Sequence, residues 1–171
     1  IANPNGISCN GCAFLNSSSS ILTTGTPVVS GARVDLHVTK GTVTIGPDGF
    51  TAGQQAGIFG RHVVINGPVT TSGSASANNL VISGGAQRVN DLDFGLLSQS
   101  SIVAAPSTVS KTSPFAIDAG EMGTLNGGDV LVRNVEAGQG VNLYGQIDGN
   151  TLTAHSADDL FYKDINVAGD A

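Results

Sequence analysis

Three short segments of this chain repeat one pattern of apolar residues. They read Val-Thr-Ile-Gly at residues 43–46, Val-Val-Ile-Asn-Gly at 63–67 and Leu-Val-Ile-Ser-Gly at 80–84. Their isoleucines are separated by steps of 20 and 17 residues, and each segment ends in a glycine turn. A period near 20 residues indicates a solenoid, in which each coil buries its apolar face against its neighbours. We interpret the three segments as one structural unit written three times.

The composition favours a solenoid made of strands. Glycine accounts for 24 of 171 residues and charged residues for only 12%, and glycine interrupts nearly all windows with helical apolar spacing. A leucine-rich repeat would need a regular leucine and asparagine signature, which the sequence lacks. Short strands with Gly, Asn and Asp at the corners fit a parallel β-helix, because these residues adopt positive φ cheaply. We therefore predict an all-β fold, a parallel β-helix, with residues 1–171 forming one domain.

The predicted solenoid is interrupted between residues 86 and 115. This stretch is rich in serine, lacks the glycine spacing and contains Pro106 and Pro114. We expect it to leave the β-helix as a hairpin or long loop, and we expect alternating strands at residues 34–38, 130–135 and 151–155 to belong to coils. In the first of these strands His37 faces solvent if its apolar neighbours face the core. Four phenylalanines are predicted to stack in the core: Phe14, Phe50, Phe59 and Phe115.

Charge and hydropathy exclude several classes of function. The net charge is −6, and the seven Lys and Arg residues are scattered, so the sequence offers no basic surface for nucleic acid or for an anionic membrane. No apolar stretch approaches the 18 residues that a spanning helix needs, and no signal peptide is visible. Because the chain starts at Ile1, we interpret it as processed, truncated or cleaved, which leaves an upstream signal open.

The opening residues combine a turn with two cysteines. Asn3-Pro4-Asn5-Gly6 predicts a tight turn, since proline fixes φ and Asn-Gly supports left-handed positions. Cys9 and Cys12 leave three interpretations open: a disulfide across the Asn10-Gly11 turn, two buried free thiols, or a redox or metal site. A zinc site would need two further ligands, and the only histidines are scattered through the sequence.

At these residues the sequence resembles the two-partner secretion (TPS) domain of large bacterial exoproteins, among them haemolysins, filamentous haemagglutinin and contact-dependent inhibition toxins. The Cys-x-x-Cys form is most similar to the haemolysin and haemagglutinin branches, the haemolysin branch above all. A second resemblance covers residues 115–147, although Glu121, Gly123 and Thr124 depart from the family pattern. The residues that match the first motif, besides Gly11 and Phe14, are Asn3, Pro4, Asn5, Gly6, Ile7, Asn10 and Asn16.

The resemblance implies a fold and a role. The family fold is a right-handed parallel β-helix, and the family role is recognition by a dedicated outer-membrane transporter whose periplasmic domains bind the segment. The matched motif residues are therefore the expected recognition residues. The domain then folds outside the cell and seeds the folding of the passenger behind it, so we expect a secreted or surface-located chain that has crossed the periplasm and outer membrane. This role needs no catalytic residue, cofactor or metal.

In the family, a capping segment precedes the motif. We therefore expect this chain to be a domain truncated at its N-terminus, with unpaired backbone groups on its first coil. Those edges would pair with the capping segment or with another copy of the exoprotein.

Two other functions remain open from the sequence. One is an adhesin or cytolysin fragment that pairs with, or templates, other β-helix chains. The other is a polysaccharide lyase or hydrolase, which would need clustered carboxylates. Asp91 with Asp93, and Asp158 with Asp159, are the candidate pairs, and solvated loop carboxylates are the simpler interpretation of both.

Overall fold

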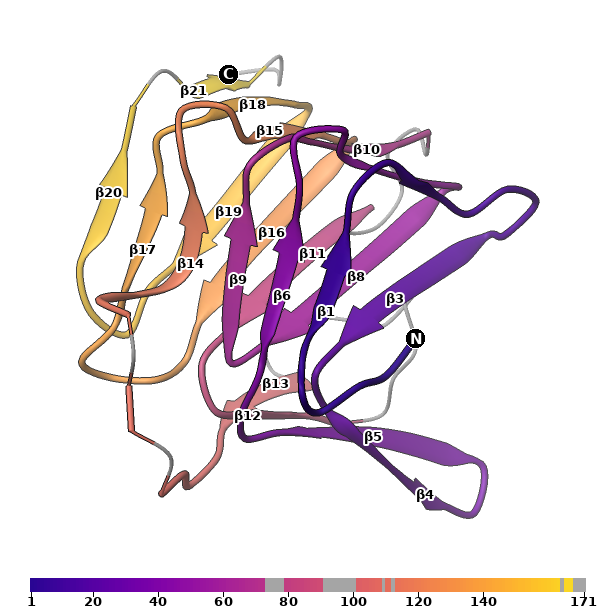
Figure 1. The fold of residues 1–171 in the computed structure, drawn as a ribbon, viewed down its shortest axis with the longest axis vertical. Helices are drawn as coiled ribbons and strands as arrows, with labels where there is room; N and C mark the ends of the chain where they lie inside the picture. The colour runs from indigo at the N-terminus through magenta and orange to yellow at the C-terminus, as the bar shows by residue number, and fades with distance from the viewer. Residues whose placement is uncertain (73–78, 91–100, 109, 112, 164, 168–171) are drawn as a thin grey trace.

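The computed structural model describes residues 1–72, 79–90, 101–108, 110–111, 113–163 and 165–167. These residues form 21 strands and contain no α-helix. Three parallel sheets wrap around one core, and a fourth, antiparallel sheet lies beside them (Figure 1). The predicted all-β fold, a parallel β-helix, is confirmed.

The strands of the three parallel sheets follow one another in a fixed order along the chain. The front sheet contains β1 (Ile7–Cys9), β6 (Thr42–Ile45), β9 (His62–Ile65), β14 (Phe115–Ala119), β17 (Gly140–Leu143) and β20 (Leu160–Tyr162). The upper sheet contains β2 (Cys12–Ala13), β7 (Phe50–Ala52), β10 (Pro68–Thr71), β15 (Thr124–Asn126), β18 (Gln146–Gly149) and β21 (Ile165–Val167). The rear sheet contains β3 (Ser19–Thr23), β8 (Gln55–Gly60), β11 (Leu80–Gly84), β16 (Asp129–Asn134) and β19 (Thr151–His155). The chain rises through the front sheet, crosses in the upper sheet and returns through the rear sheet, which makes a right-handed coil (Figure 1).

The spacing of the sequence repeat corresponds to one coil only between the first two copies. β6 and β9 are neighbours in the front sheet, with Ile45 in register with Ile65. The third copy, β11, lies in the rear sheet beside β8 and β16, so our interpretation of the three segments as one unit is wrong. All three sheets bury alternate side chains toward the same axis. Apolar alternation therefore identifies a strand without identifying its sheet.

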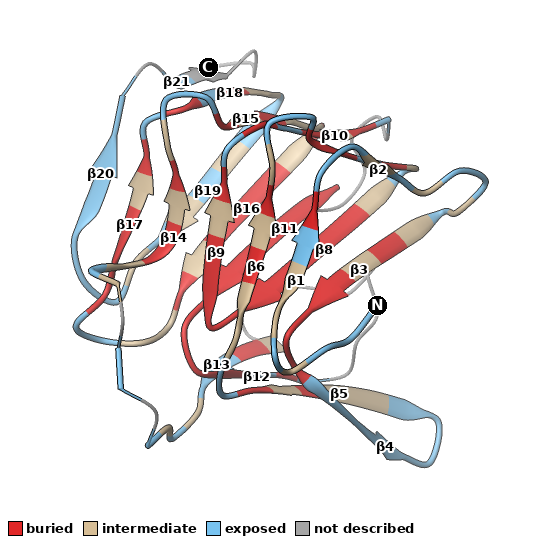
Figure 2. Cartoon of the chain, viewed as in Figure 1, coloured by how far each residue is buried: buried red, intermediate tan, exposed pale blue. Residues whose placement is uncertain are grey.

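Columns of aliphatic side chains fill the interior. Figure 2 shows that much of the front and rear sheets is buried. The columns form because parallel strands pair in register, so residues of like size stack coil upon coil. Full burial of each such side chain contributes about 1.5–3 kcal/mol. Two columns of the front sheet are Ile7, Val43, Val63, Ile117, Val141, Leu160 and Cys9, Ile45, Ile65, Ala119, Leu143, Tyr162.

Two excursions leave the rear sheet and together form the antiparallel flanking sheet. Its order is β13 (Ile102–Ala104), β12 (Gln87–Val89), β5 (Arg33–Val38) and β4 (Thr26–Ser30). The predicted hairpin within 86–115 is confirmed by the β12–β13 pairing, and residues 91–100 lie outside the described part. The assignment of residues 34–38 to a coil is wrong, because β5 pairs antiparallel with β4 and β12.

A second core lies between the flanking sheet and the outer face of the rear sheet. Leu36 and Val38 of β5 pack there against Phe59 of β8. Phe59 is fully buried, but it stands outside the solenoid axis. An outward residue of a rear strand is thus as deeply buried as an inward one, because the excursions cover it.

The remaining single-residue predictions concern three phenylalanines and one histidine. Phe50 is buried, and half-buried Phe14 packs edge-on against it with ring centroids 5.7 Å apart. Phe115 is half-buried and contacts Phe161 rather than the main core. His37 is half-buried, not solvated, because it pairs between two strands of the flanking sheet.

The first edge of the rear sheet is paired, contrary to the expectation of an open first coil. Residues 1–3 run parallel beside the end of β3, where Thr23 N–H donates to the Ile1 carbonyl (3.0 Å) and Asn3 N–H donates to the Thr23 carbonyl (2.9 Å). β1 and β2 each pair with one described strand only, so the open edges of the first coil belong to the front and upper sheets.

Candidate functional site

Residues 3–6 form a hydrogen-bonded turn at the entry to β1. Gly6 N–H donates to the Asn3 carbonyl (3.1 Å), and Asn5 N–H donates to Asn3 Oδ1 (3.1 Å). Gly6 has φ +128°, a conformation that disfavours any side chain. The turn that the sequence predicts is therefore present, closed by the side chain of Asn3.

This turn stacks on the equivalent corner of the second coil. Lys40 Nζ donates to Asn5 Oδ1 (3.2 Å). A Cβ added at Gly41 would lie 2.7 Å from the Pro4 carbonyl oxygen, so only glycine permits the approach. The first motif thus fixes the spacing between two coils as well as its own bend.

Asn10 forms a second stacked corner at the other end of β1. Its Oδ1 accepts from Asp48 N–H (2.9 Å), and its Nδ2 donates to Asp48 Oδ2 (2.7 Å). Below it, a Cβ at Gly46 would lie 2.3 Å from Asn10 Oδ1. The side chain therefore acts as a two-point clamp on the second coil.

The other motif residues lie between and beyond these corners. Ile7 packs on the core in register with Val43. Asn16 is exposed in the turn after β2, with φ 58°. The structure joins Cys9 and Cys12 by a disulfide, with Cα atoms 5.6 Å apart. Neither a redox helix nor, within the described residues, a metal-binding group of three or more His, Cys, Asp or Glu side chains accompanies them.

The structure thus places the motif on three successive corners of the first coil rather than in one patch. Asn3, Asn5, Asn10 and Asn16 are all exposed. Their partners in the second coil, Lys40 and Asp48, are not predicted from the sequence. They lie 35 and 38 residues from the asparagines they contact, and no local pattern marks them.

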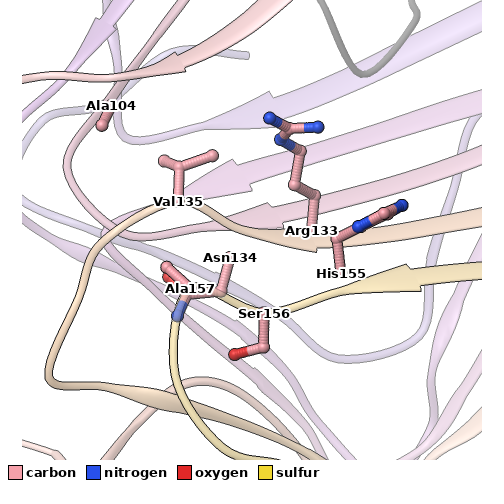
Figure 3. A pocket seen from close by; sticks show the side chains of 7 residues that line it. All are labelled: Ala104, Arg133, Asn134, Val135, His155, Ser156 and Ala157. Carbon is pink, nitrogen blue, oxygen red and sulfur yellow. The ribbon is translucent and has the colours of Figure 1, made fainter.

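A hollow of about 340 Å³ on the outer face of the rear sheet has two basic side chains in its lining (Figure 3). Arg133 and His155 stand in register on β16 and β19, and burial lowers the pKa of the Arg133 guanidinium from its usual value. The described lining contains no carboxylate. It therefore lacks the paired acids that a lyase or hydrolase would need.

The carboxylate pairs considered for an enzyme are not brought together with that hollow. Asp91 and Asp93 lie outside the described residues. Asp158 and Asp159 occupy the bend before β20 and line a different hollow. No helix in the described ranges is long and apolar enough to cross a membrane.

Similarity to known proteins extends over most of the chain. The family described as the TPS secretion domain matches residues 1–160. Filamentous hemagglutinin of Bordetella pertussis is 32% identical over 171 residues, covering 98% of this chain and 5% of that protein. Toxin CdiA of Escherichia coli is 32% identical over 84% of this chain and 4% of its own length. Hemolysin of Serratia marcescens is 29% identical over 92% of this chain and 10% of its own length.

A solved structure has the same fold. The crystal structure of the filamentous hemagglutinin secretion domain superposes with a TM-score of 0.77 at 24% identity, covering 98% of this chain and 65% of that chain. The chain spans a tenth or less of the curated relatives, so their printed activities, nuclease names included, belong to those proteins.

These findings confirm the predicted family and its export role. A secretion domain serves the passage of an exoprotein through the outer membrane, to the surface or beyond. The chain belongs to the TPS secretion domain family.

Proposed function

We propose that the periplasmic domains of an outer-membrane transporter recognise this chain through the corners of its first coil, at Asn3, Pro4, Asn5, Gly6, Ile7, Asn10 and Asn16. The observation that carries the proposal is that the asparagines of the motif are exposed on the outside of the coil, not buried in its core. Exposed amide side chains offer both donors and acceptors to a partner.

A purely structural role for the asparagines is the competing explanation. Asn3, Asn5 and Asn10 each hold a corner by an internal hydrogen bond. Replacing one of them therefore removes a recognition group and a structural bond together. The test must separate these two losses.

The Asn10–Asp48 pair provides that separation. Asn10→Ala and Asp48→Ala both break the side-chain contact between the two corners. Asn10→Ala also removes the acceptor of the Asp48 N–H, so the loss of export in each variant is compared with the change in its own urea unfolding midpoint. If the transporter contacts the Asn10 side chain directly, then Asn10→Ala reduces export and binding to the purified periplasmic domains much more than Asp48→Ala does. Equal losses, matched by equal changes in circular dichroism, would show that only the corner matters. Asn5→Ala against Lys40→Met repeats the design at the first corner.

The second half of the proposed function is to start the folding of a longer β-helix. Residues 1–171 would fold first, as one cooperative unit, and later residues would add coils. The last coil supports this, because Leu160, Tyr162 and Ile165 continue the core columns in register with Val141, Leu143 and Ile147. Tyr162 is 65% exposed, so a side chain from a further coil could pack on it and extend the core column.

This seeding role is testable in a longer exoprotein that contains the domain. Tyr162→Asp should leave the stability of residues 1–171 nearly unchanged but slow refolding of the longer chain by about tenfold. Met122→Asp is the matched control, since Met122 is 70% exposed and lies in a turn outside the columns. Equal refolding rates for both variants would contradict the role.

A second candidate function is pairing with another β-helix chain, and β4 favours it. All five residues of this edge strand are exposed, and Val29 is 70% exposed. An edge strand without charged residues is a template for another strand. Light scattering should show association at high concentration that Val29→Lys abolishes. A monomer at every concentration would remove this candidate.

A further inference from the structure

The sequence contains four Asn-Gly pairs, whose asparagines are Asn5, Asn10, Asn66 and Asn126. In such a pair the backbone nitrogen of the glycine can attack the side-chain amide carbon of the asparagine, which closes a succinimide ring. Glycine has no Cβ to obstruct this approach. The reaction needs a side-chain amide that can rotate and a glycine N–H that is not held in a hydrogen bond. The structure therefore decides which of the four pairs can react.

The two pairs of the first coil are held at both groups. Gly6 N–H donates to the Asn3 carbonyl (3.1 Å), and Gly11 N–H donates to the Gly49 carbonyl (2.9 Å). Their asparagine side chains bond to the second-coil residues described above. Ring closure at either pair must first open these bonds.

The pair at the end of β15 is held at its glycine. Gly127 N–H donates to the Asp148 carbonyl (3.1 Å), and Asn126 is half-buried. This nitrogen, too, is available for attack only after a hydrogen bond between coils has opened.

Asn66 and Gly67 form the corner between β9 and β10, and this pair is held at neither group. Asn66 is exposed, and its side chain makes no hydrogen bond to any residue that the structure describes. Gly67 N–H likewise has no acceptor within the described ranges. The backbone of the corner is fixed, because Asn66 N–H donates to the Ile45 carbonyl (2.9 Å) and a Cβ at Gly67 would lie 2.3 Å from the Gly46 carbonyl oxygen. The exposed amide of Asn66 can therefore rotate toward a nitrogen that already stands next to it in the chain.

We propose that Asn66 is a site of spontaneous deamidation, that it reacts before the other three asparagines, and that its isoaspartate product weakens the third coil. The Gly67 nitrogen gives up its proton and forms a bond to Asn66 Cγ, while the bond from Cγ to the amide nitrogen breaks. Ammonia leaves with that proton. Water then opens the ring at one of its two carbonyl groups, which leaves aspartate or isoaspartate at this position.

The isoaspartate product lengthens the corner, because the main chain then runs through the former side-chain carbon. Ile65 and Val69 flank the corner, are buried and pair in register with both neighbouring coils. A longer connection between them shifts that register or strains the bend. The aspartate product adds a negative charge and leaves the length of the main chain unchanged.

The site can be tested by incubating the chain at mildly alkaline pH and mapping its peptides by mass spectrometry over time. Asn66 should convert at least about fivefold faster than Asn5, Asn10 or Asn126, because about that factor is lost for each hydrogen bond that must open first. In concentrated guanidinium chloride, where the chain is unfolded, the four rates should be similar. Faster conversion at one of the other three sites in the folded chain, or the same ranking in the folded and unfolded chains, would overturn the proposal.

Two variants test the effect on the coil. Asn66→Ser lacks the reactive amide and should keep its urea unfolding midpoint during the incubation, whereas the midpoint of the parent should fall as isoaspartate accumulates. Freshly prepared Asn66→Asp is the matched control, because it carries the charge of the product without the longer main chain. Equal losses in the aged parent and the aged Asn66→Ser, or a fresh Asn66→Asp as unstable as the aged parent, would refute this effect.

Discussion

Arg61, which is buried, and Glu136, which is half-buried, lie 75 residues apart in sequence and form an ion pair with Nη2 and Oε1 2.8 Å apart. Arg61 Nη1 also donates to the Thr39 carbonyl (2.9 Å) and to the Ser107 hydroxyl. Glu136 Oε2 accepts from Ala86 N–H (2.8 Å). Thr39 follows the first excursion, and Ala86 and Ser107 flank the second. The pair therefore ties both excursions to the coils where they leave and rejoin the β-helix.

Breaking this pair from one side should destabilise the whole domain. Glu136→Gln leaves the Arg61 guanidinium buried without its counter-charge, which costs about 3–5 kcal/mol. Urea unfolding at neutral pH measures the loss. Replacing both residues with leucine should cost less than either single change, because no unpaired charge remains. A single variant within about 0.5 kcal/mol of the parent would contradict this role.

Gly46→Ala should disrupt the Asn10 corner. The new Cβ would lie 2.3 Å from Asn10 Oδ1, so the clamp on Asp48 opens and about 1–3 kcal/mol is lost. Gly120→Ala is the matched control, since nothing lies within 4 Å of its added Cβ. Thermal unfolding of the two variants makes the comparison. Similar stability for both would mean that the corner relaxes without cost.

Phe59→Ala should detach the flanking sheet from the rear sheet. Phe59 is fully buried in the second core, and truncating such a ring costs about 3–5 kcal/mol. Hydrogen exchange should accelerate most in β5 and β12, which pack there, while the front sheet stays protected. Phe14→Ala, at a half-buried ring, should cost less. Uniform exchange across all sheets would instead indicate that both cores unfold together.

The Cys9–Cys12 disulfide should form in the exported protein and contribute a small stability. It closes a short loop, for which the chain-entropy estimate is about 2 kcal/mol. The double variant Cys9→Ala/Cys12→Ala should therefore fold, with a lowered urea midpoint. Thiol titration before and after reduction measures the bond directly. Two reactive thiols in the unreduced secreted protein would exclude it.

Much of the fold is set by local sequence. The alternation in residues 42–45 and 151–155 favours strands with one apolar face, and glycine with asparagine favours the bends between strands. Stacking of such segments in coils is the arrangement that buries those faces, so the parallel β-helix was predictable. The Asn3–Gly6 turn was predictable for the same reason, because its hydrogen bonds close within four residues.

Other features depend on which coils come to lie side by side, and only the tertiary structure decides that. Leu80 and Val63 begin similar segments but lie in different sheets. The apolar pattern of a strand does not specify which of the three sheets the strand joins. Asn10 meets Asp48, and Arg61 meets Glu136, across 38 and 75 residues. Such contacts depend on the register in which the coils stack. Many weak packing interactions over the whole domain set that register, so no single segment of the sequence specifies these contacts.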